Sequence, residues 1–211
     1  FVGENKDTHK DYLVTKDILP STKETTYQYV EHRSILKETL KYYGVTVKVV
    51  GEDPVSIGYP YGDKASKVRL WDKKEFYCVG EFNDAPLFGQ DRFPAGSAKT
   101  ITITEGELDA LSIYQVLGTP AVSIRSASTA AQDCERARKY LNSFEKIYLC
   151  LDNDQPGQYA TKLVARLFDP NKLRHVNLDT RKDANEFLMA GDHETLRRIW
   201  HAAKPYLPKG I

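Results

Sequence analysis

The chain has 211 residues, of which 41% are hydrophobic and 28% are charged, a balance typical of a folded globular protein with a substantial core. Its 30 Lys and Arg residues against 29 Asp and Glu residues give a net charge of +1, which excludes a histone-like basic protein and an acidic tail but not a local basic patch. No apolar stretch approaches the roughly 18–20 residues of a membrane-spanning helix, so we expect no association with a membrane.

Short segments separated by Gly and Pro make up residues 1–97, which predicts a small α+β region. A helix is predicted over Ser34–Tyr43, ending at Gly44. Four strands are predicted after it from their β-branched and aromatic residues: Val45–Val50, Val55–Tyr59, Lys67–Trp71 and Phe76–Gly80.

Strands alternate with helices from Lys99 onward. The predicted strands are Thr100–Thr104, Ala121–Ile124, Lys146–Leu151 and Leu173–Leu178. The predicted helices are Gly106–Leu117, Ser128–Leu141, Gln158–Phe168 and a last helix with Leu196, Ile199, Trp200 and Ala203 on one face. This alternation predicts an α/β fold in which a mostly parallel sheet is flanked by helices. We therefore expect one domain at 1–97 and a second at 98–203, with 204–211 as the start of a linker.

Acidic turns follow three of the strands predicted in the second half. Their carboxylates are Glu105, Glu107 and Asp109, then Asp152 and Asp154, then Asp183 and Glu186. The carboxyl ends of parallel strands share one edge of a sheet, so these turns are expected to meet. Gathered carboxylates repel unless a cation neutralises them, and ligands that are all oxygen favour Mg²⁺ or Mn²⁺. Helix capping and turn preferences explain any one turn alone, but the three together predict a metal site.

Cysteine and histidine show no ligand pattern. Cys78, Cys134 and Cys150 are far apart and form no CxxC pair, which argues against a disulfide framework and a structural zinc site and favours a reducing compartment. The five histidines are scattered, as expected for surface or core positions.

The three acidic segments resemble the signature motifs of the TOPRIM fold, which bacterial-type primases, topoisomerases and some nucleases share. The segments are Thr104–Leu111 (TEGELDAL), Leu151–Gly157 (LDNDQPG) and Lys182–Leu188 (KDANEFL). Their TEGE and KDANE forms are similar to the primase half of the T7 group of phage-type primase-helicases and their organellar relatives. Five upstream segments agree with that group: His32–Ile35, Tyr43–Val45, Lys67–Arg69, Phe76 and Leu87–Gly89.

This resemblance implies a TOPRIM domain preceded by a smaller α+β subdomain. It also implies a nucleotidyltransferase that makes short RNA primers from NTPs on single-stranded DNA. Glu105 would be the catalytic acid and general base, and Asp152 and Asp154 the principal ligands of Mg²⁺, with two ions expected and Mn²⁺ as an alternative. Three further acids would complete the metal site: Glu107, Asp109 and Asp183.

The densest basic cluster lies beside Trp71, Phe76 and Tyr77 and consists of Lys67, Arg69, Lys73 and Lys74. Basic strands with interleaved aromatics suit nucleotides and single-stranded templates, although such a cluster can also be a solvated strand face. The resemblance implies that Lys67 and Lys74 act in catalysis. Because the spacing from Arg69 to Phe76 is one residue longer than in the relatives, Lys73 could replace Lys74.

The loop at residues 123–129 lacks the glycines that relatives often carry there. Two interpretations remain open: either Arg125 and the neighbouring hydroxyls contact phosphate, or the loop is a helix start capped by Ser or Thr.

Neither a G-x-x-x-x-G-K-[ST] phosphate loop nor a zinc module is found in this sequence, so the chain is not itself a helicase. The resemblance implies the central module of a larger protein, with a zinc-binding domain and a helicase domain on the same parent chain, acting in the cytoplasm of a phage-infected bacterium. Its partners would be the template, NTPs and the RNA primer. The alternatives are another TOPRIM enzyme, such as a topoisomerase or nuclease, and a non-catalytic nucleic-acid-binding module.

Overall fold

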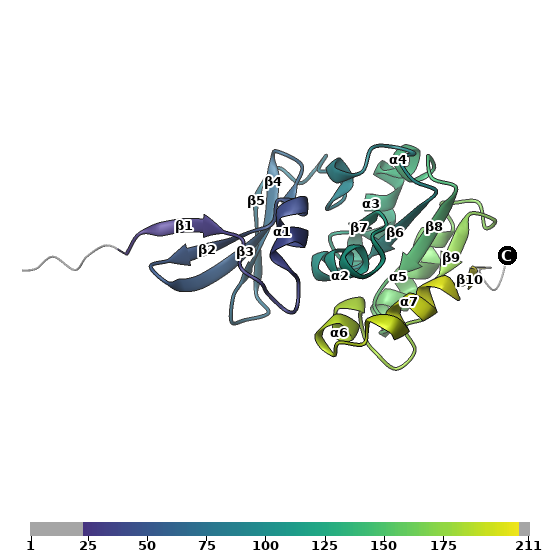
Figure 1. The fold of residues 1–211 in the computed structure, drawn as a ribbon. Helices are drawn as coiled ribbons and strands as arrows, with labels where there is room; N and C mark the ends of the chain where they lie inside the picture. Colours follow the sequence, from purple (N-terminus) through teal and green to yellow (C-terminus); the bar gives the residue numbers. More distant parts are fainter. Residues whose placement is uncertain (1–22, 207–211) are drawn as a thin grey trace, which may run out of the picture.

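A computed structural model describes residues 23–206, which form two five-stranded sheets with helices between and around them (Figure 1). The first sheet is antiparallel, in the order β1-β2-β3-β4-β5. Its strands are β1 (Thr25–Gln28), β2 (Thr46–Val50), β3 (Asp53–Tyr61), β4 (Ala65–Leu70) and β5 (Phe76–Gly80). Four of these match predicted strands, whereas β1 was not predicted and pairs with β2 at the edge of the sheet.

Helix α1 (Lys37–Tyr43) precedes this sheet and ends at Gly44, whose left-handed φ of 71° favours glycine. The helix begins three residues later than predicted, after Leu36. Alternation along β2 turns Val47 and Val49 into the core and leaves Lys48 on the opposite face.

The second sheet has the order β10-β9-β8-β6-β7. Four of its strands are parallel, namely β6 (Thr100–Thr104), β7 (Ala121–Ser123), β8 (Lys146–Cys150) and β9 (Leu173–His175). Lys204 and Pro205, which the sequence assigns to a linker, instead form β10 antiparallel to β9. Tyr206 holds them there, because its N–H donates to the carbonyl of Leu173 and its ring packs on His175. Residues 207–211 of the predicted linker lie outside the described residues.

Helices cover the second sheet (Figure 1). Three that contact one another are α2 (Glu107–Leu117), α6 (Ala184–Met189) and α7 (His193–His201), and the others are α3 (Ala130–Arg136), α4 (Arg138–Leu141) and α5 (Gln155–Ala165). Trp200 fixes α7 on the sheet, because its ring stacks on Tyr148 at 4.1 Å and its Nε1 donates to Thr102. The predicted mixed α/β class, with a parallel sheet flanked by helices, is confirmed. None of the helices in residues 23–206 is both long and apolar enough to cross a membrane.

The helices that follow the second predicted strand of the second sheet differ from expectation in three places. The helix predicted over Ser128–Leu141 is divided into a 3₁₀ turn, η2 (Ala127–Thr129), and then α3 and α4, because Ala137 has a non-helical ψ of 5°. Helix α5 begins three residues earlier than predicted, since Asp154 caps it and Pro156 suits its first turn. Helix α6 was not predicted.

Aromatic side chains join the two sheets. Tyr42 of α1 stacks on Tyr114 of α2 at 4.7 Å, and the hydroxyl of Tyr43 donates to the carbonyl of Ala121 in β7. The connecting segment contains a 3₁₀ turn, η1 (Gln90–Arg92), and Phe88 exchanges backbone hydrogen bonds with Ser123. Buried residues before and after position 97 therefore form one continuous core, which fixes how the sheets face each other. The division into domains at 97 stays a prediction.

Candidate active site

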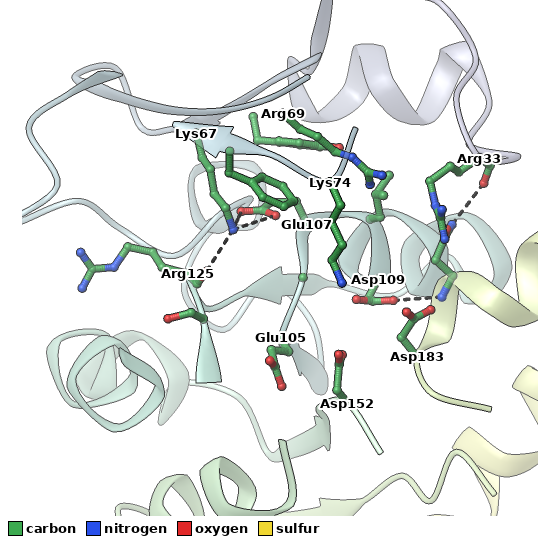
Figure 2. Close-up of a pocket in the computed structure, with 16 residues that line it drawn as sticks. Arg33, Lys67, Arg69, Lys74, Glu105, Glu107, Asp109, Arg125, Asp152 and Asp183 are labelled. Atoms are coloured by element: carbon green, nitrogen blue, oxygen red, sulfur yellow. Dashed lines mark hydrogen bonds and ion pairs between the residues drawn. The ribbon is translucent and has the colours of Figure 1, made fainter. Parts of the chain in front are cut away.

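A pocket of about 360 Å³ lies where the first sheet faces the carboxyl edge of the second. One side of the pocket belongs to the first sheet and the segments next to it. It is lined by Arg33, Tyr59, Lys67, Arg69, Lys74 and Phe76. The other side carries the carboxylates Glu105, Glu107, Asp109, Asp152 and Asp183. Figure 2 shows Lys67 and Lys74 pointing from the basic side toward the carboxylates.

Three carboxylates form the tightest acidic group. Glu105 follows β6, and Asp152 and Asp154 follow β8, which pairs in parallel with β6. One oxygen from each side chain lies within 4.8 Å of the others. Oε2 of Glu105 is buried and has no hydrogen-bond partner among residues 23–206, and burial, together with Asp152 and Asp154, raises the pKa of Glu105 to about 7. A cluster made only of oxygens, with one buried oxygen unpaired, fits Mg²⁺ or Mn²⁺.

Asp154 is positioned as the N-cap of α5. Its Oδ1 accepts the N–H of Gly157 at 3.0 Å, which lowers its pKa and leaves Oδ2 for another partner. A Cβ at Gly157 would collide with the backbone of Asp152, so glycine lets the cap close against the cluster. Lys182 forms ion pairs with Oδ2 of Asp152 and Oδ2 of Asp154, and this lysine was not predicted as a site residue.

Asp109 and Asp183 line the pocket beside the three-carboxylate group. Asp183 caps α6 by accepting the N–H of Glu186. Asp109 accepts the backbone N–H of Asn185 at 2.9 Å, and burial, reinforced by Asp183, raises its pKa well above the usual range. The two carboxylates thus also position the start of α6.

Glu107 is almost fully buried and already paired. Its Oε1 lies 2.9 Å from Nζ of Lys67 and also accepts the hydroxyl of Tyr61. Lys67 in addition donates to the carbonyl of Arg125 at 3.0 Å (Figure 2). Lys67 and Glu107 therefore neutralise each other and join β4 to α2.

The remaining basic residues differ in placement. Lys74 reaches into the space between the basic and acidic sides (Figure 2), whereas Lys73 is exposed and lies 3.9 Å from Glu75. Arg69 lies over the ring of Phe76, and its Nε is buried with no hydrogen-bond partner in the part of the chain that the structure describes. Of the two lysines that the sequence left open, Lys74 is the one that lines the pocket.

Arg33 is a pocket residue that the sequence analysis did not assign to the site. Its Nε donates to Oδ1 of Asn185 at 2.7 Å, and Nδ2 of Asn185 donates back to the carbonyl of Arg33. Arg33 and Ser34 both have positive φ values, 49° and 63°. The available signal was its place in the His32–Ile35 segment, which resembles the T7 group.

Asp133 organises the loop that contains Arg125. Its carboxylate accepts from Nε of Arg125 at 2.9 Å and from the hydroxyl of Thr129 at 2.8 Å. Although burial opposes them, these hydrogen bonds hold the pKa of Asp133 below its usual range. Figure 2 shows the guanidinium of Arg125 directed away from the acidic cluster, and no side-chain cap begins η2 or α3.

Comparison with known proteins identifies a family and similar sequences. Residues 102–188 match the family model described as Toprim-like. The chain is 32% identical over 194 residues to the DNA helicase/primase of Enterobacteria phage T3, covering 88% of this chain and 33% of that protein. It is 24% identical over 206 residues to the Twinkle homolog of Arabidopsis thaliana, covering 87% of this chain and 29% of that protein. The chain thus spans about a third of the length of these curated relatives.

Solved structures of primases share the fold of this chain. The primase fragment of the bacteriophage T7 primase-helicase superposes with a TM-score of 0.74 at 30% identity, covering 85% of this chain and 76% of that one. The DnaG catalytic core shares the fold, with a TM-score of 0.61 at 14% identity and coverage of 82% and 71%. The chain therefore belongs to the Toprim-containing primase family that the primase fragment of the T7 primase-helicase represents.

Proposed function

We propose that the chain is the primase module of a larger primase-helicase and synthesises short RNA primers from NTPs on single-stranded DNA. One observation supports this most directly: a basic strand faces a three-carboxylate cluster across one pocket. Phosphoryl transfer requires both sides, because a triphosphate must be neutralised and an attacking hydroxyl must lose its proton.

The residues divide these tasks by position. Asp152 and Asp154 would hold Mg²⁺, which, when bound, supplies charge neutralisation at the attacking and leaving oxygens. Glu105 accepts the proton of the 3′-hydroxyl, and its unpaired buried Oε2 is available for that role. Asp109 and Asp183 support the cluster from the side of α6.

The basic side binds the charged substrates. Lys74 lies inside the pocket and is placed to contact NTP phosphates. Arg69 and the ring of Phe76 offer a cation and a stacking surface to a single-stranded template. Primase domains of the T7 relative have been observed bound to an RNA/DNA hybrid, which combines the kinds of strand proposed here as primer and template.

The relatives are longer than this chain, so a helicase domain and a zinc-binding domain are proposed on its parent protein, acting in the cytoplasm of a phage-infected bacterium. Without them, the chain is expected to start RNA weakly and without sequence preference.

Incubation with single-stranded DNA, labelled NTPs and Mg²⁺ tests this function. Short RNA products that disappear in chelator and in Asp152→Asn are expected. Relaxed supercoils or cut DNA would instead indicate another Toprim enzyme, and DNA binding without products would indicate a non-catalytic module.

A further inference from the structure

Lys182 places its ammonium group against the carboxylates proposed to hold metal. Its Nζ lies 3.3 Å from Oδ2 of Asp152 and 3.1 Å from Oδ2 of Asp154. Oδ1 of Asp154 accepts the N–H of Gly157, so Oδ2 is the oxygen of Asp154 that is free of the helix cap and open to a cation. Lys182 therefore pairs with oxygens that a divalent ion would also need.

Binding of a divalent ion and of the Lys182 ammonium group to the same carboxylate oxygens at once is unfavourable. Mg²⁺ binds carboxylate oxygens at about 2.0–2.1 Å, so an ion on these oxygens would lie close to an ammonium group that contacts them too. Like charges at such short range repel strongly near a protein surface. The side chain of Lys182 is 42% exposed, so its ammonium group has water to move into.

The main chain of Lys182 is fixed independently of its side chain. Its N–H donates to Oε2 of Glu186 at 2.9 Å, and its carbonyl accepts the N–H of Asn153 at 2.7 Å. These bonds tie the start of α6 to the turn after β8, so the ammonium group can leave the carboxylates while the loop stays in place.

We propose that Lys182 is the resident counter-ion of this site: its single charge partly neutralises Asp152 and Asp154 in the metal-free protein, and a divalent cation must displace it to bind. Two consequences follow. Lys182 lowers the apparent affinity for metal, and it protects the fold from repulsion between carboxylates when metal is scarce. The inference rests on the proposed function, because it takes the three-carboxylate group as the metal site.

Binding of Mn²⁺ to the 211-residue chain, followed by the EPR signal of free Mn²⁺, tests the first consequence. Lys182→Met should bind Mn²⁺ about tenfold more tightly than the unmodified chain, a gain of about 1.4 kcal/mol. Lys182→Arg keeps the charge and should not tighten binding. Lys139→Met is the matched control, because Lys139 is an exposed residue of α4 and the net charge changes equally. It should bind Mn²⁺ within about twofold of the unmodified chain.

Thermal unfolding tests the second consequence. In chelator, Lys182→Met should unfold at a lower temperature than the unmodified chain, and saturating Mn²⁺ should close that gap. Unchanged or weaker Mn²⁺ binding by Lys182→Met, or a stability loss that Mn²⁺ does not reduce, would overturn the displacement. If the unmodified chain itself binds no Mn²⁺, or binds it as well with Asp152→Asn, the proposed metal site fails and the inference fails with it.

Discussion

Lys67 of β4 and Glu107 of α2 form an ion pair of 2.9 Å in the lining of the pocket, which joins the first sheet to helix α2. The two side chains are 17% and 5% exposed, so neither charge can turn fully to solvent. The hydroxyl of Tyr61 donates to the same carboxylate. A buried pair of this kind adds little net stability while intact, because desolvation offsets the attraction, but removing one partner leaves an uncompensated charge.

Glu107→Gln should therefore destabilise the chain by about 3 kcal/mol in urea unfolding. Lys67→Met should cost a similar amount, and the double variant should cost much less than the sum, with a coupling energy above about 1 kcal/mol. The resemblance to the T7 group instead gives Glu107 a role as metal ligand. Weakened Mn²⁺ binding by Glu107→Gln, with additive stability effects, would support that role and contradict the pairing.

Glu105 should carry a stability penalty when metal is absent. Its pKa rises from the ordinary 4.5 to about 7 because of burial and of the neighbouring Asp152 and Asp154. Above pH 7 the folded protein must hold a charge that burial disfavours, whereas below about pH 4.5 the carboxyl is protonated in both the folded and unfolded states. The penalty therefore grows as the pH rises from 4.5 to 7.

Glu105→Gln removes that titration. In chelator at pH 8 it should stabilise the chain by about 1–2 kcal/mol, a figure discounted because the group is only partly buried, and the gain should shrink toward pH 5. RNA synthesis should be lost in the same variant. Equal stability of the two proteins at pH 8, or full synthesis by Glu105→Gln, would remove Glu105 from the cluster assigned to it.

Strand order explains which parts of the pocket were predictable from sequence. The acidic turns follow strands whose alternation with helices predicts a parallel sheet, and the parallel pairing of Thr104 with Cys150 then brings Glu105 and Asp152 together. That deduction needs only the alternation of strand and helix patterns along the sequence and the rule that the carboxyl ends of parallel strands share one edge of a sheet. Helix α6 was predictable too, because Asp183 and Glu186 have the spacing of a capping box.

Contacts between the sheets were not predictable in this way. Arg33 and Asn185 lie 152 positions apart, and Lys67 of the first sheet lies 40 positions from Glu107 of helix α2. No local periodicity links such positions, because their contact depends on how two separately built layers pack. The contact between the guanidinium of Arg125 and the buried carboxylate of Asp133 spans only eight positions, but the irregular turn between them has no periodicity that predicts it.

Asn185 should act as a positioning residue for Arg33. Asn185→Ala removes both side-chain hydrogen bonds to Arg33 and the bond to Ser112, and leaves polar groups unpaired at a cost of about 1–3 kcal/mol. If Arg33 contacts substrate, the variant should also raise the KM for NTPs more than it lowers kcat. Arg33→Lys keeps the charge but loses the Nε hydrogen bond, so it should reproduce the KM effect with a smaller stability loss. An unchanged KM in both variants would make the pair structural only.

Lys74 and Lys73 provide a matched comparison within one loop. Lys74 points into the pocket, whereas Lys73 is 67% exposed beside Glu75. Lys74→Ala should weaken NTP binding about tenfold, since it removes a cation facing the phosphate site, and should leave the free energy of unfolding within about 0.5 kcal/mol of the original. Lys73→Ala changes the net charge equally and should leave both quantities nearly unchanged.

Fluorescence titration with a labelled NTP and urea unfolding of each variant measure the two effects. Equal weakening by both substitutions would mean that overall charge attracts the nucleotide, and a larger effect at Lys73 would move the binding site out of this pocket.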